Sequence, residues 1–186
     1  MKRAHLAALA LLAAASGSGC GAHAEHAAQA EGPAVTRAIA VMQPTQGNQV
    51  RGIVTFTSVA GGVRIEADIT GLTPGKHGFH VHQWGDVSGS DGKSAGGHFN
   101  PHGTEHALPA GEPRHVGDLG NLEADDSGSA RYERVDSQLA FSGTNAIVGR
   151  GLIIHALEDD GGQPTGSAGA RVAMGVIGID DAADVR

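Results

Sequence analysis

The sequence contains a single cysteine, Cys20, among its 186 residues. One cysteine cannot form an internal disulfide, and its isolation excludes the cysteine-based structural zinc sites. Aromatic residues make up only 3% of the chain, so a core must be built from Val, Ile, Leu and Ala. Positive charge is also scarce, because 13 Lys and Arg stand against 20 Asp and Glu, a net charge of −7. This charge argues against nucleic acid as a partner, since phosphate binding needs a basic face.

Long hydrophobic runs are also lacking, and the apolar run at residues 6–15 is too short to span a bilayer stably. This run follows Lys2 and Arg3 and leads through small residues to Cys20, the pattern of an export signal. We predict that residues 1–20 are a lipoprotein signal in which Cys20 becomes the acylated first residue. An ordinary cleaved signal with an incidental cysteine is the alternative. Export would place the protein in the periplasm or cell envelope, with the lipid anchor as its only membrane contact.

Glycine, in contrast, is abundant, and 30 glycines favour turns and long ordered loops over helices. Residues 21–34 lack periodicity and are predicted to form a flexible tether, followed by one domain over residues 35–186. Apolar residues then recur with a period of two, which is typical of strands. The candidate strands are 38–42, 50–58, 63–70, 76–83, 116–124, 130–136, 151–156 and 171–177. The first, apolar at every position, predicts a strand buried on both faces. Together they indicate an antiparallel all-β sandwich or barrel.

Two segments interrupt this alternation and are predicted to be long functional loops. Residues 85–114 are dense in Gly, His and Pro, and residues 158–170 are rich in Gly. Beside the first loop, His80 and His82 flank Val81 on a predicted strand, so both imidazoles project from one face. Two histidines spaced in this way suit one metal ion, although an isolated pair is weak evidence.

Further metal-ligand candidates lie on the first loop, at its end and on a later strand. They are His98, His106, His115, Asp118 and His155. Neutral imidazole suits both zinc and copper, and an added carboxylate suits zinc better than Cu(I). The sequence therefore predicts metal binding by residues from two strands and one loop.

Several motifs resemble the copper–zinc superoxide dismutase family, and the resemblance runs from about Val35 to Ile179. In chain order they are Gly78–Asp86 (GFHVHQWGD), Gly97–Pro101 (GHFNP), Arg114–Asn121 (RHVGDLGN) and Gly175–Gly178 (GVIG). The resemblance implies a Greek-key β-sandwich or flattened barrel of about eight antiparallel strands with two long functional loops. It also implies one copper and one zinc per chain.

The resemblance further assigns residues to roles. His80, His82, His98 and His155 would bind copper, and His98, His106, His115 and Asp118 would bind zinc, with His98 bridging the two ions. Asp159 would link a copper-ligand and a zinc-ligand histidine, and Arg171 would guide the substrate. The implied reaction is disproportionation of the superoxide anion to dioxygen and hydrogen peroxide, with His98 also carrying a proton. A non-catalytic copper- or zinc-binding protein of the cell envelope is the alternative. A homodimer is compatible with the resemblance, but the sequence does not indicate a pairing surface.

The chain departs from the family in two ways. Where most members have a disulfide, this chain has Gly92 and Met174, and the segment between His155 and Arg171 is shorter than in the well-known eukaryotic members. The second departure predicts slower or less salt-dependent turnover. Two further histidines of the predicted domain are not assigned to metals: His77 is expected to have a structural role and His102 to be a solvated loop residue.

Overall fold

The computed structural model describes residues 34–180. The strands are β1 (Arg37–Pro44), β2 (Arg51–Val59), β3 (Gly62–Thr70), β4 (Gly75–His82), β5 (Asp118–Ala124), β6 (Ala130–Asp136), β7 (Gly151–His155), β8 (Arg171–Val176) and β9 (Gly178–Ile179). Within this range the only helical element is one 3-10 turn, η1 (Lys93–Ala95). No helix among these residues is long and apolar enough to cross a membrane. The predicted signal and most of the predicted tether lie outside the described residues.

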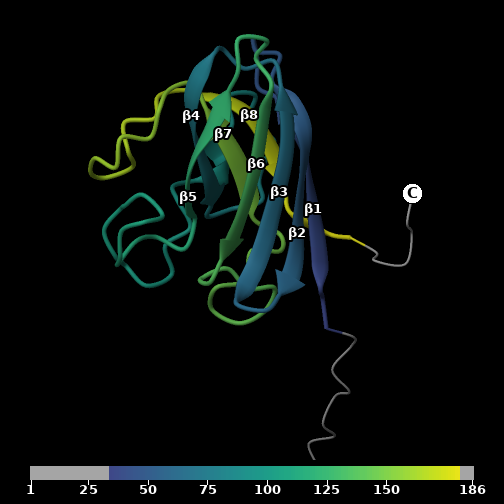
Figure 1. Ribbon diagram of the computed structural model, residues 1–186, viewed down its shortest axis with the longest axis vertical. Helices are drawn as coiled ribbons and strands as arrows, with labels where there is room; N and C mark the ends of the chain where they lie inside the picture. The colour runs from purple at the N-terminus through teal and green to yellow at the C-terminus, as the bar shows by residue number, and fades with distance from the viewer. Residues whose placement is uncertain (1–33, 181–186) are drawn as a thin grey trace, which may run out of the picture. The chain divides into compact units, whose positions relative to one another are not determined.

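The strands close into an antiparallel barrel (Figure 1). Their order is β2-β3-β6-β5-β4-β7-β8-β1, and β1 pairs again with β2, so the sheet has no open edge between these two strands. The short strand β9 lies against β1 as an addition. Strand β3 neighbours β6 rather than β4, as in a Greek key. The predicted fold class is therefore confirmed.

Alternation of apolar and polar residues decides which face of each strand enters the barrel. In β3, Ile65 and Ile69 are buried while Glu66 and Asp68 are exposed. The prediction that the first strand is buried on both faces is wrong, because Val41 in β1 is 51% exposed. A closed barrel has a single interior, and the outer face of a strand is buried only where a loop covers it.

Two long loops cover such an outer face. They join β4 to β5 (residues 83–117) and β7 to β8 (residues 156–170), and Figure 1 shows both leaving the same side of the barrel. Hydrogen bonds dock them on β4, from Gly78 N–H to the Leu157 carbonyl and from Val81 N–H to the Gly117 carbonyl. As a result β4 is buried on both of its faces.

Candidate metal centre

Strand β4 presents two histidines to the loops and two apolar side chains to the core. Phe79 and Val81 belong to the buried core, and His80 and His82 point to the opposite face, as the period of two predicts. His155 ends the neighbouring strand β7, whose Ile154 pairs with Phe79. Three imidazoles are therefore positioned by adjacent strands.

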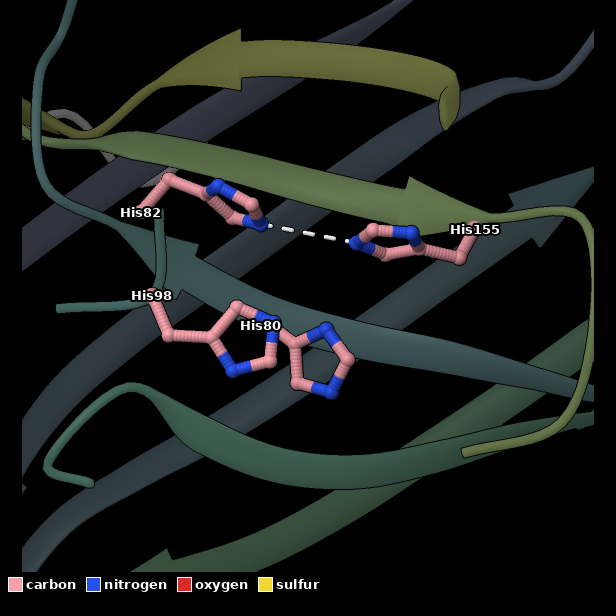
Figure 2. A group of neighbouring side chains, drawn as sticks. All are labelled: His80, His82, His98 and His155. Atoms are coloured by element: carbon pink, nitrogen blue, oxygen red, sulfur yellow. Dashed lines mark hydrogen bonds between the residues drawn. The ribbon is translucent and has the colours of Figure 1, made fainter. Parts of the chain in front are cut away.

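A fourth imidazole joins them from loop 83–117. His98 forms an isolated β-bridge with His82, and Phe99 N–H donates to the Val81 carbonyl at 2.9 Å. The rings of His80 and His98 stack with their centroids 4.0 Å apart, and Nε2 of His82 lies 3.4 Å from Nε2 of His155 (Figure 2). All four rings offer a nitrogen, and these nitrogens lie within 4.8 Å of one another. We call this set, His80, His82, His98 and His155, the four-histidine group.

A second group shares His98 and adds a carboxylate. Its members are His98, His106, His115 and Asp118, with their ligand atoms also within 4.8 Å of one another. Oδ1 of Asp118 lies 2.8 Å from Nδ1 of His98 and 3.1 Å from Nδ1 of His115. Oδ2 lies 3.0 Å from Nδ1 of His106. We call this set the carboxylate group. The sequence-predicted residues are thus brought together in two groups that meet at His98.

Hydrogen bonds from the far side of each ring decide which nitrogen faces the four-histidine group. Nδ1–H of His82 donates to the Gly96 carbonyl at 2.9 Å, and Nδ1–H of His155 donates to the Gly169 carbonyl at 3.2 Å. Each bond leaves Nε2 of its ring without a proton and turned inward. Such outer contacts are what orient histidines that bind a metal.

Asp159 makes the same kind of contact to both groups. Its Oδ2 accepts from Nε2–H of His80 at 2.8 Å, and its Oδ1 accepts from Nε2–H of His106 at 2.9 Å. Both histidines therefore present Nδ1 to their groups. The structure places Asp159, fully buried, at the linking position that the sequence predicted.

Two supporting residues were missed at the sequence level. Asn121 binds the backbone of Asp159 at both its N–H and its carbonyl. Arg114, also buried, donates to the Asp118 carbonyl at 3.0 Å and pairs with Asp136. Both residues lie within the motif at residues 114–121, which was the only sequence signal for them. The motif does not show their roles, because their partners are distant in sequence or are backbone atoms.

The inward nitrogens fit bound cations. Nδ1 of His80 and Nδ1 of His106 are buried without a hydrogen-bond partner among the described residues. His106 Nδ1 is close to Asp118, yet in an orientation that forms no hydrogen bond, as expected for two ligands of one ion. A buried unpaired nitrogen is costly, and a metal ion removes the cost. Four nitrogens suit copper, and three nitrogens with one carboxylate suit zinc.

Burial lowers the pKa of three of the rings, which keeps them in the neutral form that binds a metal. It lowers the pKa of His80 to about 4 and that of His155 to about 3, and with the charge of His98 it lowers the pKa of His82 well below its usual range. These rings are neutral at physiological pH, which is the form that binds a metal. His106 differs from these three rings. Burial disfavours its protonated form, but Asp118 and Asp159 together favour that form more strongly and raise the pKa of His106 to about 9.

Three members of the four-histidine group, His82, His98 and His155, line a cavity of about 460 Å³. Its charged lining residues are Arg171, Lys93 and Asp91, so the cationic side chains outnumber the anionic one. The Arg171 guanidinium donates to the carbonyls of Gly92 and Gly96, which holds it beside His82 and His155. The cavity therefore combines the four-histidine group with a cation, which suits a small anionic ligand.

The two unassigned histidines among the described residues, His77 and His102, lie outside both groups, as predicted. His77 is buried with Nδ1 2.8 Å from the His155 carbonyl, which is a structural contact. His102 is exposed, with Nε2 2.7 Å from Oδ1 of Asn145. The two positions aligned with the family disulfide are adjacent, since a Cβ built on Gly92 would lie 3.6 Å from Sδ of Met174.

The chain is similar to known proteins in both sequence and structure. The family model described as copper/zinc superoxide dismutase matches residues 50–177. Among solved structures, the crystal structure of the clock protein EA4 is 44% identical to this chain and superposes with a TM-score of 0.74. The match covers 81% of this chain and 99% of that one.

Proposed function

Because this chain belongs to the copper/zinc superoxide dismutase family, we propose that it disproportionates superoxide to dioxygen and hydrogen peroxide. The observation that carries the proposal is the position of His98, which belongs to both groups while the four-histidine group borders a cavity containing Arg171. A metal-binding site alone does not require a cation in the cavity beside it. A reaction that consumes a small anion is favoured by one.

We assign the metals from the donor sets. The four-histidine group, His80, His82, His98 and His155, would hold one copper, and the carboxylate group, His98, His106, His115 and Asp118, would hold one zinc. Bound copper would supply a one-electron couple that accepts an electron from one superoxide and returns it to the next, while zinc has no redox role.

The side chains of this site would attract the substrate, orient the metal ligands and supply a proton. Arg171 attracts the superoxide anion into the cavity although the whole chain is acidic, because a local positive charge in a cleft outweighs a distant negative surface. His98 has Nδ1 against Asp118, so its Nε2 is the atom that would carry a proton toward the product peroxide. Asp159 keeps His80 and His106 in the orientation that each group needs.

A non-catalytic metal-binding protein of the cell envelope is the second candidate. It is favoured by one observation: a protein 44% identical to this chain is named as a clock protein rather than as a dismutase. Metal analysis does not separate the two candidate functions, because a dismutase and a non-catalytic metal-binding protein would both bind metal through the same ligands of this chain.

Turnover separates them. Superoxide decay is followed by pulse radiolysis with protein lacking the predicted signal and loaded with copper and zinc, beside His155→Ala. We expect rapid decay with the parent protein and its loss in His155→Ala. Absence of decay at full copper occupancy would refute the dismutase and favour the metal-binding protein.

We also propose that the protein is exported and anchored through an acylated Cys20. The support is the sequence alone, since residues 1–33 lie outside those described. Mass spectrometry of the membrane fraction should find a lipid on Cys20, and Cys20→Ser should release the protein from that fraction. An unmodified Cys20 in the membrane fraction would overturn the anchor.

A further inference from the structure

A hairpin at one end of the barrel is hydrogen-bonded to the loop beside the four-histidine group. The hairpin is residues 45–50, between β1 and β2, and it faces residues 83–97 of the β4–β5 loop. Gln46 N–H donates to the Ser90 carbonyl at 2.8 Å, and Ser90 Oγ–H donates to Oε1 of Gln46 at 3.1 Å. These two bonds join Gln46 and Ser90 through both backbone and side chain.

The same hairpin is bound to the start of β8. Thr45 is only 3% exposed, and its Oγ1–H donates to the Arg171 carbonyl at 2.7 Å. Thr45 N–H donates to the Val172 carbonyl at 3.2 Å, which extends the β1–β8 pairing beyond Pro44. The hairpin therefore connects residues 83–97 to the backbone of Arg171. We call Thr45, Gln46 and Ser90, with these bonds, the clasp.

What the clasp holds is central to the cavity. The Gly96 carbonyl, in residues 83–97, accepts from the Arg171 guanidinium at 2.6 Å and from Nδ1–H of His82 at 2.9 Å. The Gly92 carbonyl accepts from the same guanidinium. A displacement of these residues would therefore move the Arg171 cation and release the His82 ring together.

No covalent bond between the loop and β8 backs up these contacts. A Cβ at position 92 would be in van der Waals contact with Met174 Sδ, but neither Gly92 nor Met174 can form a disulfide. We propose that the clasp positions residues 83–97, and through them Arg171 and His82, in place of a covalent cross-link. This assignment rests on the proposed function, since it treats the Arg171 cavity as the substrate site. Thr45 and Gln46 are accordingly positioning residues.

Two variants remove different parts of the clasp. Thr45→Val keeps the side-chain shape and removes the hydroxyl that reaches Arg171, and Thr45→Ser should restore it. Gln46→Ala removes the acceptor for Ser90 from an exposed position, so it leaves the core intact if Thr45→Val proves too unstable. Gln49→Ala is the matched control, because the Gln49 side chain takes no part in the described bonds between hairpin and loop.

Hydrogen exchange of the full chain measures the clasp without reference to catalysis. Amides within residues 89–96 should exchange about fivefold faster or more in Thr45→Val and in Gln46→Ala, the effect of losing one hydrogen bond. The ends of β3 and β6 farthest from the hairpin, residues 62–66 and 133–136, should be unchanged, and Thr45→Ser and Gln49→Ala should match the parent protein. Unchanged exchange at residues 89–96 in both variants would overturn the proposal.

Anion binding provides the second measurement. In copper-loaded protein, the affinity for azide, read from its optical charge-transfer band, should fall several-fold in Thr45→Val while the copper content stays the same. An unchanged azide affinity would show that the clasp does not position Arg171. If the parent protein proves inactive toward superoxide but exchange and azide affinity shift as expected, the proposed function fails and the positioning role stands.

Discussion

Asn121 holds the backbone of Asp159 at two points. Its Nδ2–H donates to the Asp159 carbonyl at 2.9 Å, and its Oδ1 accepts from Asp159 N–H at 2.7 Å. Because Asp159 bonds to a histidine of each metal group, these two bonds fix the carboxylate that both groups depend on.

The first prediction follows from this pair. Asn121→Ala should weaken binding of both copper and zinc by about tenfold, at the lower end of the effect of removing outer contacts to metal ligands. Competition titration against chelators of known affinity measures both constants. Asn145→Ala, which removes an amide bound to His102, should leave both affinities unchanged. A loss confined to one metal would contradict the shared role of Asp159.

Substitution of neighbouring loop histidines tests the selection of the zinc ligands. His106→Ala should greatly reduce zinc affinity, because it removes one of four donors and leaves Asp118 without that partner. His102→Ala should not, because His102 is exposed and bonded to Asn145. Zinc content after dialysis at micromolar free zinc reports both results. Equal zinc content in the two variants would show that the ligand set is assigned wrongly.

Gly166 tests the packing around Asp159. It has φ +75°, and a Cβ there would overlap Oδ1 of Asp159. Gly166→Ala should therefore displace the carboxylate and weaken metal binding, besides costing about 1 kcal/mol of stability for the left-handed backbone. Gly143→Ala, also at φ +75° but with nothing within 4 Å, should cost stability alone. Calorimetry and metal titration separate the two effects, and retained metal affinity in Gly166→Ala would refute the steric argument.

Alkaline pH should destabilise the protein through Tyr132. Burial raises its pKa to about 12 from an ordinary value of 10.0, and its hydroxyl donates to the Leu119 carbonyl at 2.8 Å. A raised folded-state pKa favours the protonated folded form, so this contribution to the free energy of unfolding is complete below the unfolded-state pKa. It is lost as the pH rises from there toward the folded-state value. Urea titrations over this pH range should show a steeper fall for the parent protein than for Tyr132→Phe, and parallel curves would contradict the assignment.

The segment between His155 and Arg171, shorter than in the well-known eukaryotic members of the family, predicts weak electrostatic steering. The Debye length shrinks from about 30 Å at 0.01 M salt to about 8 Å at 0.15 M, so a strongly steered reaction slows markedly over this range. We expect the rate constant for superoxide decay to lie below the diffusion limit and to change by less than about twofold. A diffusion-limited rate with steep salt dependence would disprove this prediction.

Local regularities explain which parts of the fold were predictable. Alternation marked the inward residues of β3, and the same period put His80 and His82 on one face of β4, because successive side chains of a strand point to opposite faces. The error at β1 has a related cause. Val41 is as apolar as its buried neighbours, and no pattern within one strand shows whether a distant loop will cover its outer face.

The sequence by itself determined the strand alternation, the two loop segments and, through motif resemblance, the residues of both metal groups. Only the tertiary structure decided which nitrogen each ring presents, because that depends on the carbonyls of Gly96 and Gly169 and on Asp159, brought close by barrel closure. A backbone carbonyl leaves no signature in a sequence, since every residue has one. The contact between the hairpin and residues 83–97 was hidden for the same reason: Gln46 and Ser90 meet only when β1 pairs with β8 and the loop folds back over it.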